Sequence, residues 1–230
     1  MIDKTLNGLN YFFKTLVLKK EVPCLFGMVI TDKCNLDCFY CESKNSGRYH
    51  FSFEQAKNTM RDAFQRGHRT LYFTGGEPMV WEDNGHNLGE LVAFARDLGF
   101  LEVFIYTNGT QPLLIEQCKY VVTIDGPKDV HDQIRCNSYD LVLENVKNAV
   151  TKAIFATITL SKANAEFLDR YVKEITDTRL FRRISFNLLT HWPEIVEKHG
   201  LSMKKRKKLL DKIKATQQGW LSNSPFRRRI

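Results

Sequence analysis

Three cysteines near the start of the chain have a number and spacing that suit metal chemistry. Cys34, Cys38 and Cys41 form a C-x3-C-x2-C pattern within one short segment. Thiolates this close in sequence can converge on one metal centre without help from the rest of the fold. A closed iron–sulfur carrier or a structural zinc site takes four protein ligands. Three cysteines would therefore leave one metal position open for a small molecule.

The cysteines considered alone also fit a zinc site or a set of core thiols. His50 would complete a zinc site, although the gap between Cys41 and His50 is wide for common zinc spacings. As core thiols, the three cysteines would be reduced and bind no metal. Further motifs along the chain favour an iron–sulfur cluster.

Three more motifs follow the cysteines in chain order. They are T-G-G-E-P at 74–78, Y-T-N-G-T at 106–110 and T-I-D-G-P at 123–127, the last followed by His131, Asp132 and Arg135. With the cysteines, these segments resemble the radical S-adenosylmethionine (SAM) superfamily. They are most similar to the branch that holds the peptide-modifying and anaerobic sulfatase maturases and the molybdopterin-synthesis enzyme. The similarity covers about residues 23–189.

The chain departs from that branch in two places. Thr123 stands where the branch has a serine, and it keeps the hydroxyl group. Such maturases usually carry a cysteine-rich C-terminal domain with auxiliary clusters, but no cysteine follows Cys136 here. We expect any auxiliary domain to be absent or to lie beyond Ile230.

The resemblance implies both the cofactors and the reaction. One 4Fe–4S cluster would be bound by Cys34, Cys38 and Cys41, with SAM on the open iron. Reductive cleavage of SAM would give methionine and a 5′-deoxyadenosyl radical, which takes hydrogen from the substrate. A low-potential electron donor such as a flavodoxin or ferredoxin would be the partner.

The resemblance also implies which residues contact SAM. The expected cofactor-binding residues are Tyr40, Gly75, Gly76, Glu77, Asn108, Thr123 and Arg135. The two glycines would let the backbone approach the methionine moiety. Glu77 would accept a hydrogen bond from its ammonium group, and Arg135 would pair with its carboxylate. Tyr40 would lie against the adenine, and Thr123 would bind carboxylate or ribose.

Several further residues are expected to have structural roles or to lie near the substrate. Asp125 is expected to organise a turn, and His131 and Asp132 to hold the segment up to Arg135 in shape. His191 and Trp192 are weak candidates for substrate contact. No residue is assigned as catalytic.

From residue 23 the sequence alternates between strand and helix patterns. The expected strands are Cys24–Ile30, Arg69–Phe73, Glu102–Tyr106, Tyr120–Ile124, Ile154–Leu160 and Arg183–Leu188. The expected helices are Ser52–Arg66, Asn87–Leu98, Pro112–Cys118, Tyr139–Thr151, Ala163–Ile175 and Ser202–Gln217. Six such units predict a parallel α/β sheet, and the resemblance favours an open (βα)6 partial TIM barrel over a flat sheet. All the motifs then fall at carboxyl ends of strands, where such folds bind ligands.

The domain organisation predicted from these patterns has three parts. Residues 1–22 form an amphipathic helix, which packs on the barrel or lies at a membrane surface. Residues 23–218 form the core, with a linker at Thr190–Gly200. Residues 219–230 form a basic tail.

Composition narrows the class of protein. The 230 residues are 43% hydrophobic and 26% charged, which is ordinary for a globular protein. Six cysteines with three in one loop do not suggest a disulfide framework, and no signal peptide is apparent, so we expect a cytoplasmic protein. The net charge of +8 comes from the segment after Ser202. No aromatic-rich motif accompanies this charge, so nucleic acid is not an expected partner.

The predicted function is a radical SAM enzyme acting on an unidentified peptide, lipid or small molecule. The alternative is an iron–sulfur electron-transfer or metal-binding module without SAM turnover. A third hypothesis is a barrel that binds SAM or a protein partner but does not turn over.

Overall fold

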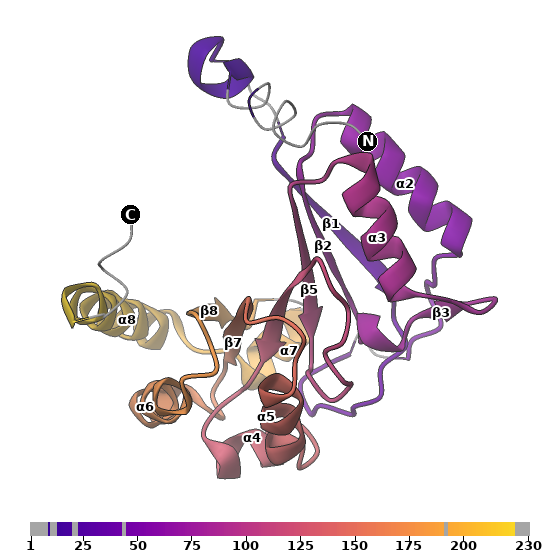
Figure 1. Ribbon diagram of the computed structural model, residues 1–230. Helices are drawn as coiled ribbons and strands as arrows, with labels where there is room; N and C mark the ends of the chain where they lie inside the picture. The colour runs from indigo at the N-terminus through magenta and orange to yellow at the C-terminus, as the bar shows by residue number, and fades with distance from the viewer. Residues whose placement is uncertain (1–8, 10–12, 20–22, 43–44, 191–192, 224–230) are drawn as a thin grey trace.

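The computed structural model describes residues 9, 13–19, 23–42, 45–190 and 193–223 (Figure 1). Its main sheet has the strand order β1-β2-β5-β6-β7-β8. These strands are β1 (Leu25–Thr31), β2 (Thr70–Gly75), β5 (Glu102–Thr107), β6 (Lys119–Thr123), β7 (Ile154–Leu160) and β8 (Ile184–Leu188). Each strand pairs in parallel with the next one along the sheet. The prediction of a six-stranded parallel α/β fold is confirmed.

Helices connect most of these strands. They are α2 (Phe53–Gln65), α3 (Leu88–Leu98), α4 (Lys128–Ile134), α5 (Tyr139–Lys147), α6 (Leu168–Thr178), α7 (Pro193–His199) and α8 (Met203–Asn223). Shorter elements are the π-helical turn η1 (Phe13–Val17), the 3₁₀ turns η2 (Pro78–Val80) and η3 (Ala165–Phe167), and a hairpin of β3 (Glu82–Asp83) and β4 (His86–Asn87). Figure 1 shows α2 and α3 side by side along the first strands.

The hydrophobic core lies between the sheet and its helices. Side chains alternate along a strand, so every second residue points at the helices. Ile30, Phe73 and Ile105 point this way and are completely buried with Met60 of α2 and Leu91 of α3. The intervening strand residues form what we call the inner face. These residues are Leu25, Gly27, Val29, Thr70, Tyr72, Thr74, Glu102, Phe104, Tyr106, Lys119, Val121, Thr123, Phe155, Thr157, Thr159, Ser185 and Asn187.

The helix predicted at Pro112–Cys118 is wrong, because this connection between β5 and β6 is an irregular loop. Tertiary contacts satisfy its backbone in place of helical hydrogen bonds. The Tyr120 hydroxyl accepts from Ile115 N (2.8 Å) and donates to Ile115 O (3.0 Å). A short apolar segment can resemble a helix in sequence and still be held open by a neighbouring side chain.

Other boundaries also differ from the prediction. The expected linker Thr190–Gly200 contains α7, and α8 continues to Asn223. Most of the helix predicted for residues 1–22 lies outside the described residues. Within the described part of this segment, Phe13–Val17 form η1. No helix in the described ranges is both long and apolar enough to cross a membrane.

A capping box at the start of α2 provides a test of local stability. The Ser52 hydroxyl accepts from Gln55 N, and the Gln55 side chain accepts from Ser52 N. We expect Ser52→Ala to lower the free energy of unfolding by about 1 kcal/mol, measured by urea denaturation. Gln65→Ala, at the exposed end of the same helix, is the control. Equal stability of both variants would contradict the expectation.

Candidate functional site

The cysteines lie in the loop that follows β1, and polar side chains fix its course. Asn45 brackets Cys34, because its Oδ1 accepts from Cys34 N (2.9 Å) and its Nδ2 donates to Cys34 O (3.1 Å). The Asp32 carboxylate accepts from the Ser46 hydroxyl and from Arg48 N (2.8 Å). The loop is therefore held in shape by its own polar groups.

The three thiols differ in exposure but lie within electrostatic range of one another. Cys38 is buried, whereas Cys34 and Cys41 are partly exposed. Burial raises the pKa of Cys34 and raises that of Cys38 to about 11, and repulsion between neighbouring thiolates adds to both shifts. Arg135 acts in the opposite direction on both thiols.

A cluster fits this donor set better than a single metal ion. Among the described residues, no three Cys, His, Asp or Glu side chains are arranged to hold one ion. In a 4Fe–4S cluster each thiolate binds a different iron, so the sulfurs lie farther apart than around one metal ion. His50 does not fit the zinc alternative, because its two ring nitrogens contact Thr31 Oγ1 (2.9 Å) and Glu82 O (3.0 Å).

Gly75 and Gly76 bring the end of β2 against the cysteine loop. Gly76 N donates to Thr31 O (2.8 Å). A Cβ atom would lie 2.1 Å from Thr31 O at Gly75 and 2.2 Å from Lys33 O at Gly76. Both positions therefore need glycine because loop backbone occupies the space of a side chain. The expected approach of SAM to these glycines stays a prediction.

Glu77 is completely buried and ties the ends of two strands together. Its carboxylate accepts from Met79 N (3.0 Å), the Thr107 hydroxyl (2.8 Å) and Asn108 N (2.6 Å). Burial raises the pKa of Glu77, and these donors partly counter the rise. Sequence reasoning missed this structural role, and the expected contact with the SAM ammonium stays a prediction.

Asn108 joins the end of β5 to the cysteine loop. Its Oδ1 accepts from Thr110 N (2.9 Å) and so stabilises the turn after β5. Its Nδ2 donates to Asn35 Oδ1 (2.8 Å) and lies 4.0 Å from Cys34 Sγ. The side chain therefore reaches the first cysteine, which the sequence did not indicate.

Asp125 is a buried centre that joins three segments of the site. Its Oδ2 accepts from the Tyr40 hydroxyl and from Arg135 Nε (2.5 Å), and its Oδ1 accepts from Thr159 N (2.8 Å). Arg135 Nη2 also donates to the Tyr40 hydroxyl (2.9 Å). Burial opposes the guanidinium charge, but Asp125 keeps the pKa of Arg135 well above its ordinary value. Two residues expected on SAM are thus linked to each other through Asp125.

His131 holds the Asp125 segment from behind. Its Nδ1 accepts from Asp125 N (3.1 Å), so the proton lies on Nε2, 3.0 Å from Ser138 Oγ. Burial, with Arg135, lowers the pKa of His131 to about 4. Asp132 accepts from Tyr139 N (2.9 Å). These contacts agree with the structural roles expected for His131 and Asp132.

Three predicted residues remain, of which the structure describes Thr123. Thr123, at the end of β6, is partly exposed on the inner face. His191 and Trp192 lie outside the described residues.

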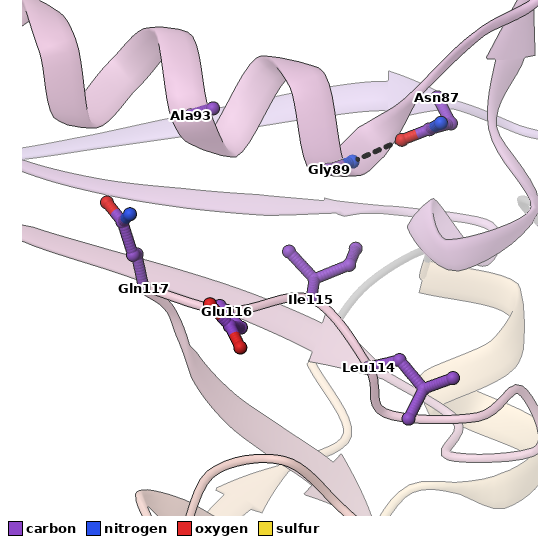
Figure 2. Close-up of a pocket in the computed structure, with 7 residues that line it drawn as sticks. All are labelled: Asn87, Gly89, Ala93, Leu114, Ile115, Glu116 and Gln117. Carbon is purple, nitrogen blue, oxygen red and sulfur yellow. Dashed lines mark hydrogen bonds between the residues drawn. The ribbon is translucent and has the colours of Figure 1, made fainter.

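A separate cavity of about 330 Å³ lies between the start of α3 and the loop before β6 (Figure 2). Asn87, Gly89 and Ala93 line one side of it, and residues 114–117 line the other. The Asn87 side chain there accepts from Gly89 N (2.9 Å) as a helix cap. No predicted site residue is among its lining residues, so we assign it no role.

The Asp125 cluster gives the first prediction for this site. Asp125→Asn leaves the buried Arg135 charge without its carboxylate, so we expect the free energy of unfolding to fall by about 3–5 kcal/mol. Guanidinium denaturation measures this change. Asp129→Asn is the control, because Asp129 pairs with Arg170 on the surface. A loss no larger than that of the control would contradict a central role for Asp125.

The lowered pKa of His131 gives the second prediction for this site. Between pH 6.5 and about 4 the unfolded chain binds a proton at His131 that the native protein does not. Stability from this residue is therefore complete above pH 6.5 and is lost on acidification, by about 3 kcal/mol in total. We expect His131→Gln to lose correspondingly less stability between pH 7 and pH 4 in urea titrations. Parallel pH profiles for both proteins would contradict this.

Comparison with known sequences gives relatives that share part of this chain. A 7,8-dihydro-6-hydroxymethylpterin dimethyltransferase from Methanocaldococcus jannaschii is 37% identical over 111 residues, covering 46% of this chain and 21% of that protein. A probable GTP 3′,8-cyclase from Methanococcus maripaludis is 27% identical over 161 residues, covering 65% of this chain and 52% of that protein. The chain thus spans from about a fifth to about half of the length of these relatives.

Solved structures share the fold. Native anSMEcpe with bound AdoMet and the Cp18Cys peptide aligns with a TM-score of 0.66 at 16% identity, over 89% of this chain and 62% of that one. Streptococcus suis SuiB aligns with a TM-score of 0.66 at 14% identity, over 93% of this chain and 51% of that one. These alignments confirm the partial TIM barrel.

The sequence profile described as the radical SAM superfamily matches residues 28–163, which include the three cysteines and every later motif. This match covers more than half of the chain. The chain therefore belongs to the radical SAM superfamily, whose enzymes use a 4Fe–4S cluster and SAM.

Proposed function

We propose that Cys34, Cys38 and Cys41 hold the 4Fe–4S cluster and that SAM binds beside it at the carboxyl ends of β2, β5 and β6. The observation that carries this proposal is the direct bonding of the cysteine loop to all three strand ends. Glu77, Asn108 and Asp125 make these bonds. When bound, the cluster and SAM supply the electron and the 5′-deoxyadenosyl radical for hydrogen abstraction.

The chain's own residues position and shield these groups. Arg135 uses Nε and Nη2 for Asp125 and Tyr40, and Nη1 has no hydrogen-bond partner among the described residues. This nitrogen is our proposed donor to the SAM carboxylate. Glu77 accepts three hydrogen bonds and retains one lone-pair direction for the SAM ammonium. Gly75 and Gly76 would offer backbone groups, and Tyr40, Asn108 and Thr123 would border the adenosine.

The substrate we propose is a small heteroaromatic compound. The two curated relatives act, by their names, on a pterin and on GTP, which both contain a fused bicyclic ring. The peptide expected from the sequence is supported by anSMEcpe, but its identity of 16% carries the fold alone. The closer sequence relatives therefore outweigh the structural neighbours for this choice.

Two partners and the domain limits complete the proposal. A low-potential electron donor such as a flavodoxin or ferredoxin would reduce the cluster, because the chemistry needs one electron. Residues 23–218 would form the catalytic core, with 1–22 and 219–230 as flanking segments. A reducing cytoplasm would protect the cluster, and membrane contact through residues 1–22 stays a separate proposal.

One experiment separates this function from a closed electron carrier. Anaerobically reconstituted protein is reduced with dithionite, and its electron paramagnetic resonance spectrum is recorded with and without SAM. We expect SAM to change the cluster signal and 5′-deoxyadenosine and methionine to be released. Cys38→Ala should abolish both results, because it removes a ligand of the cluster.

Cys118→Ala is the matched control for that variant. Cys38 and Cys118 are each 6% exposed, so both substitutions remove a buried thiol. We expect Cys118→Ala to retain cluster content and SAM cleavage. A spectrum that SAM does not change, with no cleavage, would overturn the proposed function in favour of an electron-transfer module.

A further inference from the structure

The charges on the inner face are few and are already paired. Among its described residues, Glu102 and Lys119 are the two that carry a charge. Lys119 Nζ lies 2.7 Å from a Glu102 carboxylate oxygen, and 5.4 Å from the centre of the Phe104 ring. This pair neutralises itself near the amino ends of β5 and β6. The face, as far as the structure describes it, therefore offers no unpaired cation.

Two tyrosines form an aromatic corner on the β1–β5 half of the same face. The rings of Tyr72 and Tyr106 meet edge to face with centres 5.4 Å apart. Tyr72 lies directly over Gly27, where a Cβ atom would come within 2.2 Å of its ring. Tyr106 is 38% exposed although it sits on a central strand. Among the described residues, neither tyrosine hydroxyl has a hydrogen-bond partner.

Towards the carboxyl ends of β6, β7 and β8 the inner face is polar but uncharged. Thr123, Thr157 and Ser185 lie in register across the three strands. Asn187 lies two residues after Ser185 on β8, and its Nδ2 donates to Thr157 Oγ1 (3.2 Å). Hydroxyl and amide groups of this kind can donate to or accept from ring nitrogens, carbonyls and hydroxyls of a ligand.

Two charged groups beside this face are committed to the SAM site proposed above. Glu77 accepts hydrogen bonds from three donors, and Arg135 is paired with Asp125. A phosphorylated ligand needs several Lys or Arg side chains, because burying anionic oxygens without cations is costly. The described residues of the inner face do not supply them.

We propose that the inner face selects an uncharged aromatic or heteroaromatic substrate, with Tyr72 and Tyr106 as the residues that determine this specificity. The inference rests on the proposed function and narrows its substrate class. The tyrosine pair stacks against the ring, and the Thr and Asn side chains of β7 and β8 bind its polar edge. A nucleoside or free pterin fits this surface, and a nucleoside triphosphate does not.

Three probes test this specificity on the anaerobically reconstituted protein with SAM present. Guanosine and GTP share base and ribose and differ in the triphosphate alone, and 6-hydroxymethyl-7,8-dihydropterin is a second uncharged ring. Equilibrium dialysis measures their dissociation constants. We expect at least one uncharged probe to bind, and GTP to bind at least about tenfold more weakly than guanosine.

Three variants assign the binding to residues. Tyr72→Ala and Tyr106→Ala should each weaken binding of the uncharged probe about tenfold or more, as expected for loss of a stacked ring. Leu141→Ala is the control, because Leu141 is 47% exposed on α5, away from the inner face. A fourth variant, Lys119→Ala, should leave the ratio of GTP to guanosine affinity unchanged.

The outcomes separate this inference from the proposed function. A SAM-dependent change of the cluster spectrum tests the proposed function without any probe, so this measurement is made first. With that change present, three results would overturn the substrate inference: GTP binding as tightly as guanosine, no binding of any probe, or tyrosine variants that bind like the control. Loss of GTP binding in Lys119→Ala would do the same, because it would show that Lys119 serves a phosphate.

Discussion

The buried ion pair between Asp125 and Arg135 is the interaction on which the site depends. A carboxylate inside a protein is tolerated when its oxygens are fully engaged. Asp125 meets this condition by accepting from the cysteine loop, from the residue after α4 and from β7. Its backbone N donates to His131 Nδ1, and its carbonyl accepts from Asn164 Nδ2. Because one side chain satisfies its own charge by joining these segments, the position of the cysteines is coupled to the far half of the barrel.

The fold was largely predictable because its signals are local and repeated. Six strand patterns alternating with helix patterns from residue 23 predicted the parallel sheet. The segment Pro112–Cys118 was not predictable, because the Tyr120 hydroxyl decides its conformation from outside the segment. The turn α4 is short and carries no periodic apolar stripe, so it also escaped prediction.

The candidate site was predictable in its members but not in their partners. Motifs identified Glu77, Asn108 and Arg135 as site residues. Glu77 and Asn108 lie at the expected strand ends, and Arg135 follows α4. Their hydrogen bonds run mainly to one another and to the loop, over separations of up to 95 residues. Sequence spacing cannot reveal such pairs, because it contains no information on which side chain satisfies which buried charge. The resemblance predicted contacts with SAM for residues that the structure shows hydrogen-bonded to other residues of the site.

The chain-order arrangement of the sheet has a consequence for biosynthesis. Every strand pairs with its predecessor in the sheet, so the sheet can grow as the chain leaves the ribosome. The bonds from Tyr40 to Asp125 and Arg135 cannot form until those residues have been translated. Before that point the cysteine loop is held by its own polar groups and by the ends of β2 and β5. Its anchorage to the second half of the barrel therefore follows synthesis of residue 135.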